Sequence, residues 1–154
     1  MADDKITVER TIQASSDRVF DVLSNPERHQ EIDGSGFIQS DAGTNRIQGT
    51  GEVFTMNMSG DHMGGDYQTE NTVTGFEPNR LIAWQTAPAG KEPPGWQWVW
   101  ELESQGSDET LVRHTYDWSG VTDQQLRDRV GFPLVSEAQL EDSLTRLDQA
   151  VTGS

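Results

Sequence analysis

Two side chains that can transfer protons, His114 and Tyr116, stand two positions apart in the sequence. They alternate with Val112 and Trp118, and alternate side chains of a β-strand share one face. An imidazole and a phenol on one apolar face could form an acid–base pair beside a substrate carbonyl or an acidic C–H bond, provided that the histidine titrates near neutral pH. A histidine that is merely hydrogen-bonded at the edge of the core would give the same pattern, so both interpretations stay open.

Three tryptophans at every second position form the second pattern with chemical meaning. Trp96, Trp98 and Trp100 share one face of a predicted strand, and the residues between them point the other way. A chain this polar is not expected to expose three successive indoles, so this wall either packs as core or lines a concave site for an apolar or aromatic molecule. Because Trp96 follows Pro93-Pro94-Gly95, we expect it at the mouth of such a site and partly exposed.

The same alternation predicts a ligand pocket built from several strands and the last helix. Its predicted lining is Phe54, Met56, Asn71, Trp84, Trp98, Trp100, His114, Tyr116, Trp118, Leu140 and Leu144. Asn71 is the polar amide of this set, and it could orient a ligand hydroxyl or carbonyl group or satisfy its own backbone. Met56, Met58 and Met63 add adaptable surface near a glycine-rich hairpin at 59–66, which could act as a mobile lid.

No metal or cofactor site is predicted. Asp61, His62 and Asp66 crowd one loop, and His29 and Asp33 another, but each group has a single histidine, and aspartates are common in turns. The sequence has neither a glycine-rich phosphate loop between a strand and a helix nor a Gly-x-Ser-x-Gly motif. It also has no cysteine, which excludes disulfides and cysteine-ligated metal centres.

These residues require strands that carry them on one face and a helix that covers that face. A first strand is predicted at 5–13, and apolar alternation runs from Phe37 to Trp118, interrupted by turn residues, which indicates an antiparallel sheet. Ser15 is a suitable cap for one short helix, and Asn25-Pro26 opens another that continues to about Ile32.

The period changes to that of a helix after the last predicted strand. Residues 123–130 suit a short helix, and 134–151 a long one whose apolar face is Leu140, Leu144, Leu147 and Val151. This helix is the element long enough to cover the sheet. We therefore predict one domain over 1–154, with its core at about 5–151.

Composition narrows the classes of partner. The formal charge of −15 argues against nucleic acid and anionic membranes, which bind clustered lysine and arginine. The absence of a run of about 18 apolar residues and of a signal-peptide pattern predicts a cytoplasmic protein without membrane insertion. Lysine occurs at Lys5 and Lys91 alone, which together with the acidity fits a salty cytoplasm or a GC-rich genome.

The order of these elements resembles the START-like (SRPBCC, or Bet v 1-like) superfamily, and more narrowly its polyketide cyclase/dehydrase and lipid-transport branch. The resemblance is carried by Ile6-Thr7-Val8-Glu9-Arg10-Thr11-Ile12, Val19-Phe20-Asp21-Val22-Leu23, Asn25-Pro26-Glu27-Arg28-His29, Asn71 to Pro78, Arg80-Leu81-Ile82-Ala83-Trp84, Thr110 to Trp118 and Ser143 to Leu147. It implies an α+β helix-grip fold: a curved antiparallel sheet of about six to seven strands around a long C-terminal helix, with two short helices after the first strand.

The resemblance implies a cavity between sheet and helix, and it leaves the occupant open. The first hypothesis is a monomer or homodimer that sequesters or carries a small hydrophobic, ring-containing ligand. The second is a cyclase or dehydratase in which His114 and Tyr116 transfer protons, without a cofactor. The third is an interaction protein similar to the chaperone-activating branch of the superfamily. Because that superfamily shares no catalytic motif, the sequence does not choose among them.

Overall fold

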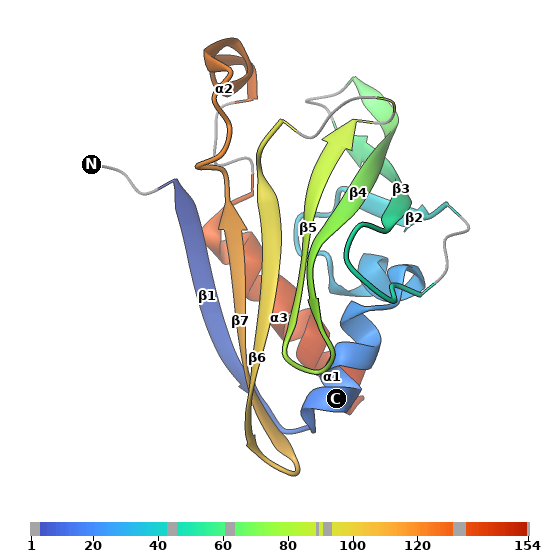
Figure 1. Cartoon of the computed structure of the whole chain (residues 1–154), viewed down its shortest axis with the longest axis vertical. Helices are drawn as coiled ribbons and strands as arrows, with labels where there is room; N and C mark the ends of the chain where they lie inside the picture. The colour runs from blue at the N-terminus through green and yellow to red at the C-terminus, as the bar shows by residue number, and fades with distance from the viewer. Residues whose placement is uncertain are drawn as a thin grey trace.

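In the computed structural model of this protein, the described residues form one sheet of seven antiparallel strands (Figure 1). The structure describes residues 4–42, 46–60, 64–88, 90, 94–130 and 135–153, except for the side chains at 88, 129 and 130. The strands are β1 (Lys5–Ile12), β2 (Ile38–Asp41), β3 (Val53–Gly60), β4 (Gly65–Glu77), β5 (Leu81–Pro88), β6 (Gln97–Gly106) and β7 (Glu109–Asp117), in the spatial order β1-β7-β6-β5-β4-β3-β2.

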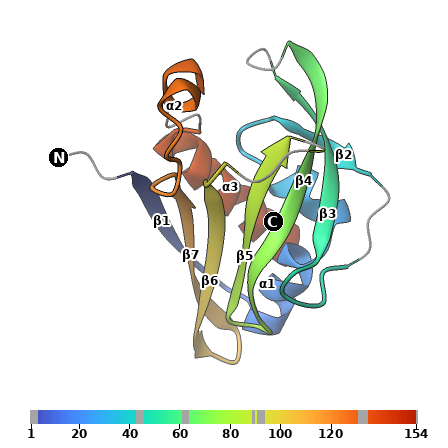
Figure 2. The same ribbon diagram turned by 45° about the horizontal axis from the view of Figure 1, so that its top comes forward.

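Within the described ranges, the sheet is accompanied by four helical segments: α1 (Ser16–Leu23), the 3-10 helix η1 (Pro26–Ile32), α2 (Gln124–Val130) and α3 (Glu137–Thr152). The sheet curves around α3, which crosses one face of it, while α1 and η1 lie beside the C-terminal end of α3 (Figures 1 and 2). The predicted fold class is therefore confirmed. No helix in the described part of the chain is long and apolar enough to span a membrane.

Three features of the helices and strands differ from the sequence-based expectation. The second short helix is a 3-10 helix, with the Asn25 side chain accepting from the backbone N–H of Glu27. The long helix begins at Glu137, because Ser136 and Gln139 form a reciprocal capping box that fixes its first turn. Trp96 and Trp118 lie just outside the strands to which they were assigned.

The core lies between the concave face of the sheet and α3. Leu140, Leu144, Leu147 and Val151 are all buried, which confirms the predicted apolar face of that helix. Two arginines from other elements cap its C-terminal end: Arg18 donates to the carbonyl oxygen of Val151 and Arg28 to that of Ala150. The helix has no basic residue in its own last turn, so these guanidinium groups supply the charge that its carbonyl end favours.

Candidate functional site

Aromatic side chains of β6 and β7 interleave on the concave face of the sheet. The ring centroids of Trp100 and His114 lie 3.6 Å apart, and those of Trp98 and Tyr116 lie 4.3 Å apart, with interplanar angles of 14° and 10°. Trp98 also lies nearly parallel to His114 at 6.0 Å. Register explains the arrangement, because Trp100 pairs with His114 and Trp98 with Tyr116 across the two strands.

This stack uses the faces of its rings. Trp98 is flanked by Tyr116 and His114, and His114 by Trp98 and Trp100, so each of these two rings has a neighbour in near-parallel orientation. Rings stacked in this way direct their outer edges away from the sheet, and the edge of an aromatic ring carries a positive partial charge. Within the predicted wall, Trp98 therefore offers a ligand mainly its ring edge, because His114 and Tyr116 lie nearly parallel to its ring.

His114 lies within this stack as a neutral imidazole. Its Nδ1–H donates to the carbonyl oxygen of Val99 at 3.2 Å, since a carbonyl can only accept, and this fixes the tautomer with a lone pair on Nε2. Burial lowers the pKa of His114 to about 3, and the hydrogen bond to Val99 opposes that shift only in part. A histidine with this pKa is a poor proton acceptor at neutral pH.

A chain of hydrogen bonds crosses the concave face next to the stack. The indole N–H of Trp98 donates to Oγ1 of Thr86 (3.1 Å), and the hydroxyl of Thr86 donates to Oδ1 of Asn71 (2.7 Å). Nδ2 of Asn71 donates to the carbonyl oxygen of Phe54 (3.2 Å) and to Oγ1 of Thr69 (3.4 Å). Of these residues Thr69, Thr86 and Asn71 are buried, so the chain is a polar strip inside an apolar face.

A second aromatic cluster joins η1 to the sheet. His29 stacks on Trp84 with ring centroids 5.1 Å apart and meets Phe54 edge to face at 5.4 Å. Its Nε2–H donates to the carbonyl oxygen of Leu23, at the end of α1, over 2.7 Å. Burial lowers the pKa of His29 to about 4, so this imidazole too is neutral at pH 7. His29 was not predicted to belong to the site, because a single histidine shortly after Asn25-Pro26 has no sequence pattern that points to the sheet.

Burial of the concave-face residues is graded from one end to the other. Partly exposed apolar and aromatic side chains gather where the β3–β4 hairpin, the start of β6 and α2 lie, at the top of Figure 1. We call this group the rim, and its members are Phe37, Met58, Tyr67, Trp96, Trp98 and Leu126. The expected partial exposure of Trp96 is thus observed. Burial raises the pKa of the Tyr67 phenol to about 12, and the charge of Asp33 adds to the shift.

The remaining predicted lining residues lie deeper than the rim. Phe54, Met56, Asn71, Trp84, Trp100, His114, Tyr116, Trp118, Leu140 and Leu144 are each at most 8% exposed. The structure therefore brings the whole predicted set together on one face and against α3, with Trp98 as the member that reaches the rim. Thr69 and Thr86 belong to the same face but were not predicted, since threonine is an ordinary strand residue and gives no separate signal.

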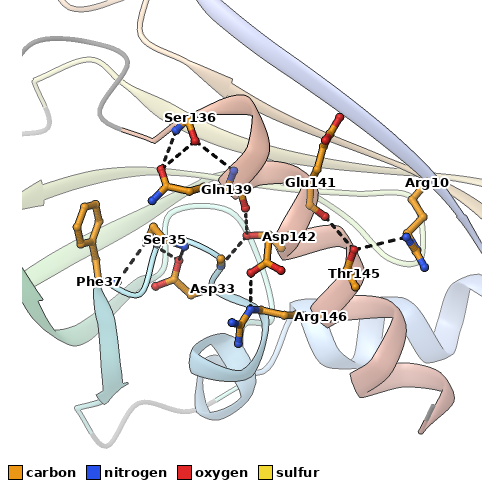
Figure 3. A network of polar contacts seen from close by, with 12 residues as sticks. Arg10, Asp33, Ser35, Phe37, Ser136, Gln139, Glu141, Asp142, Thr145 and Arg146 are labelled. Atoms are coloured by element: carbon orange, nitrogen blue, oxygen red, sulfur yellow. Dashed lines mark hydrogen bonds and ion pairs between the residues drawn. The ribbon is translucent and has the colours of Figure 1, made fainter.

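A tight turn holds the rim against α3. Oδ1 of Asp33 accepts from the backbone N–H and the hydroxyl of Ser35, Oδ2 accepts from the N–H of Ile38, and the N–H of Gly34 donates to Oγ of Ser143 on α3. Figure 3 shows this turn lying along the first half of the helix, next to the Ser136–Gln139 capping box. Phe37 follows directly, so the turn sets where this rim residue stands.

Neither the metal groups nor the lid considered in the sequence can be placed in full. Among the described residues, no three His, Asp or Glu side chains are grouped as metal ligands would be. Asp61, His62 and Met63 lie outside those residues, and with them the tip of the predicted lid. His29 and Asp33 do not form a metal pair, because the Nε2–H of His29 is bonded to Leu23 and the Asp33 carboxylate accepts from its own turn.

Comparison with known proteins gives a relative in sequence and several solved structures of similar fold. An uncharacterized protein of Mycobacterium tuberculosis is 29% identical over 147 residues, which cover 92% of this chain and 62% of that protein. The chain thus spans less than two thirds of the length of this curated relative.

Solved structures share the fold at lower identity. The Zhui aromatase/cyclase from a Streptomyces species superposes with a TM-score of 0.66 at 15% identity, covering 96% of this chain and 93% of that one. The solution structure of the Aha1 dimer from Colwellia psychrerythraea gives 0.54 at 22% identity, covering 98% and 96%. These likenesses, together with a family model that matches residues 13–152, confirm the resemblance to the START-like superfamily. The chain belongs to the family described as Activator of Hsp90 ATPase homolog 1-like protein.

Proposed function

We propose that this protein binds a small, neutral, ring-containing apolar molecule at the rim, between the concave face of the sheet and α3. The observation that carries the proposal is the graded burial of that face. Trp100, His114 and Tyr116 are buried within the face, whereas the side chains of the rim are partly exposed, so a further apolar group at the rim would complete their burial. A neutral ligand is favoured because the chain carries a formal charge of −15.

The test uses N-phenyl-1-naphthylamine, a neutral probe whose fluorescence rises in apolar surroundings. We expect saturable binding to the wild type and affinity weakened about tenfold, equivalent to about 1.4 kcal/mol, when Met58→Gln removes an apolar rim contact. Trp98→Phe should weaken binding as well, because it shortens the rim side chain that stacks on Tyr116. Glutamine keeps the length of methionine, so the first variant changes polarity more than shape.

Val53→Ala is the matched control for the two rim variants. Val53 is a large exposed apolar residue, at 53%, and it lies on the opposite face of the sheet from Phe54. Its truncation should leave probe binding unchanged. A wild type that does not bind the probe, or rim variants that bind as tightly as the wild type, would count against the proposal.

The family match favours a second candidate function, which is the third hypothesis of the sequence analysis. The matched family is named after an activator of the Hsp90 ATPase, and we propose as the second candidate function that this chain contacts a chaperone ATPase. The rim would then be a protein contact surface. Measuring the ATPase rate of Hsp90 with and without this protein tests the idea, and an unchanged rate with no complex in sedimentation would exclude it.

An enzymatic cyclase or dehydratase function has weaker support. His114 is held neutral by burial, and its Nδ1–H is committed to Val99, so it cannot act as a proton donor without breaking that hydrogen bond. Tyr116 is 1% exposed and stacked on Trp98. Proton transfer by this pair would require the aromatic stack to open, whereas binding at the rim would not.

A further inference from the structure

The hydrogen-bond chain on the concave face has a fixed direction. An indole N–H can only donate, so Thr86 accepts from Trp98 and directs its own proton to Oδ1 of Asn71. The carbonyl oxygen of Phe54 can only accept, which places Nδ2 of Asn71 on that side. The oxygen and the nitrogen of the Asn71 amide are thus assigned consistently, because Trp98 can only donate and the Phe54 carbonyl oxygen can only accept.

The chain ends at the hydroxyl of Thr69. Oγ1 of Thr69 accepts from Nδ2 of Asn71, and within the described part of the chain no acceptor lies within hydrogen-bond distance of the hydroxyl proton. Thr69 is 5% exposed. A buried hydroxyl normally finds an acceptor, and leaving its proton without one destabilises the folded protein. The hydroxyl is also polarised by the donors in the chain before it, which strengthens it as a donor.

Thr69 lies one step inside the rim. It stands between Tyr67 and Asn71 on one face of β4, and it is opposite Met56 on β3, whereas Tyr67 is opposite Met58. Tyr67 and Met58 belong to the rim, so Thr69 is the next residue behind the rim on this face of β4, within reach of a molecule bound there.

We infer that the ligand of the rim carries a carbonyl oxygen that accepts a hydrogen bond from the hydroxyl of Thr69, which makes neutral ring ketones and quinones the favoured class. This inference rests on the proposed binding function. A neutral acceptor is preferred over a carboxylate, because the chain is strongly acidic and Asp33 acts on Tyr67 at the same rim. The ring edges of the aromatic stack suit the same ligands, since their positive partial charge attracts carbonyl oxygens.

The experiment compares two probes of nearly equal shape, 9-fluorenone and fluorene, by equilibrium dialysis against the whole protein. They differ in a carbonyl group in place of a methylene group. The quantity measured is the ratio of the two dissociation constants in the wild type, in Thr69→Val and in Thr69→Ser. Valine keeps the shape of threonine without the hydroxyl, and serine keeps the hydroxyl.

Thr69→Val should shift the ratio by about tenfold against fluorenone, while fluorene binding stays the same, and Thr69→Ser should keep the ratio of the wild type. Thr69→Ala provides a second variant without the hydroxyl should the valine variant not fold. An unchanged ratio in both variants that lack the hydroxyl, with both probes still bound, overturns this inference and leaves the binding function intact. Binding of neither probe to the wild type overturns both.

Discussion

Gly34 provides the sharpest test of how the rim is held on α3. Its N–H donates to Oγ of Ser143 over 2.8 Å, and a Cβ atom at this position would overlap the carbonyl oxygen of Gln139 and lie 2.8 Å from the backbone nitrogen of Ser143. Both obstacles are main-chain atoms in the first half of α3, so neither can move aside as a flexible side chain would. Gly34→Ala must therefore push the turn and the helix apart.

The cost follows from two contributions. Overpacking by one methyl group against rigid neighbours costs about 1–3 kcal/mol, and losing the hydrogen bond to Ser143 adds about 1 kcal/mol. We expect the free energy of unfolding to fall by about 3 kcal/mol. With a urea m-value of about 2 kcal/mol/M for a chain of this size, the unfolding midpoint followed by tryptophan fluorescence should drop by about 1.5 M.

Gly49→Ala is the matched control for this substitution. The nearest atom to its added Cβ is Oε2 of Glu52, at an ordinary contact distance of 3.7 Å. The free energy of unfolding of this variant should stay within about 0.5 kcal/mol of the wild type. If Gly34→Ala were as stable as Gly49→Ala, the close contact between the 33–36 turn and α3 would be wrong, and with it the account of how Phe37 is positioned.

Two further predictions concern charge. His29 and His114 have folded-state pKa values of about 4 and 3, below the usual 6.5, so the unfolded chain binds more protons below pH 6.5 and stability falls as the pH drops toward those values. At pH 5 each of these two histidines should lower the free energy of unfolding by about 2 kcal/mol. In NMR spectra, two of the three histidine Cε1–H resonances should stay constant from pH 8 to 5. Titration of all three near pH 6.5 would refute the burial of His29 and His114. Arg127 donates to the carbonyl oxygens of Val121 and Trp118 and pairs with Asp4, so Arg127→Met should lower the free energy of unfolding by about 2 kcal/mol. Arg146→Met removes an exposed pair with Asp142 and should cost less than about 0.5 kcal/mol in the same urea titration, and equal losses in the two variants would refute this role of Arg127.

The sheet and its covering helix were predictable from the sequence because their patterns are periodic. Alternation in β5, β6 and β7 assigns each side chain to a face without reference to any partner strand, and the spacing of Leu140, Leu144 and Leu147 does the same for α3. The grouping of the predicted lining on one face follows directly, since each residue needed only its own parity.

Contacts that depend on register were not predictable in this way. Asn71 was recognised as polar, but its acceptor contact with Thr86 becomes visible only once β4 is paired with β5, and that pairing contains an irregularity between Val73 and Gly75. His29 joins the site through the position of η1 against Phe54 and Trp84, which are distant in sequence. Local sequence patterns do not predict contacts between residues that are distant in the sequence.

In the proposed binding mode, the aromatic rim and the hydrogen-bond chain would contribute differently, the first to affinity and the second to discrimination between ligands. Because Trp98 and His114 already use their faces on one another and on Tyr116 and Trp100, a ring that enters at the rim cannot gain by sliding between them without breaking those contacts. In the proposed binding mode, apolar contact with the rim would therefore supply the affinity, and such contact discriminates poorly among flat molecules of similar size. Discrimination must come from a group that is costly to leave unpaired, and on this face the buried hydroxyl of Thr69 is such a group.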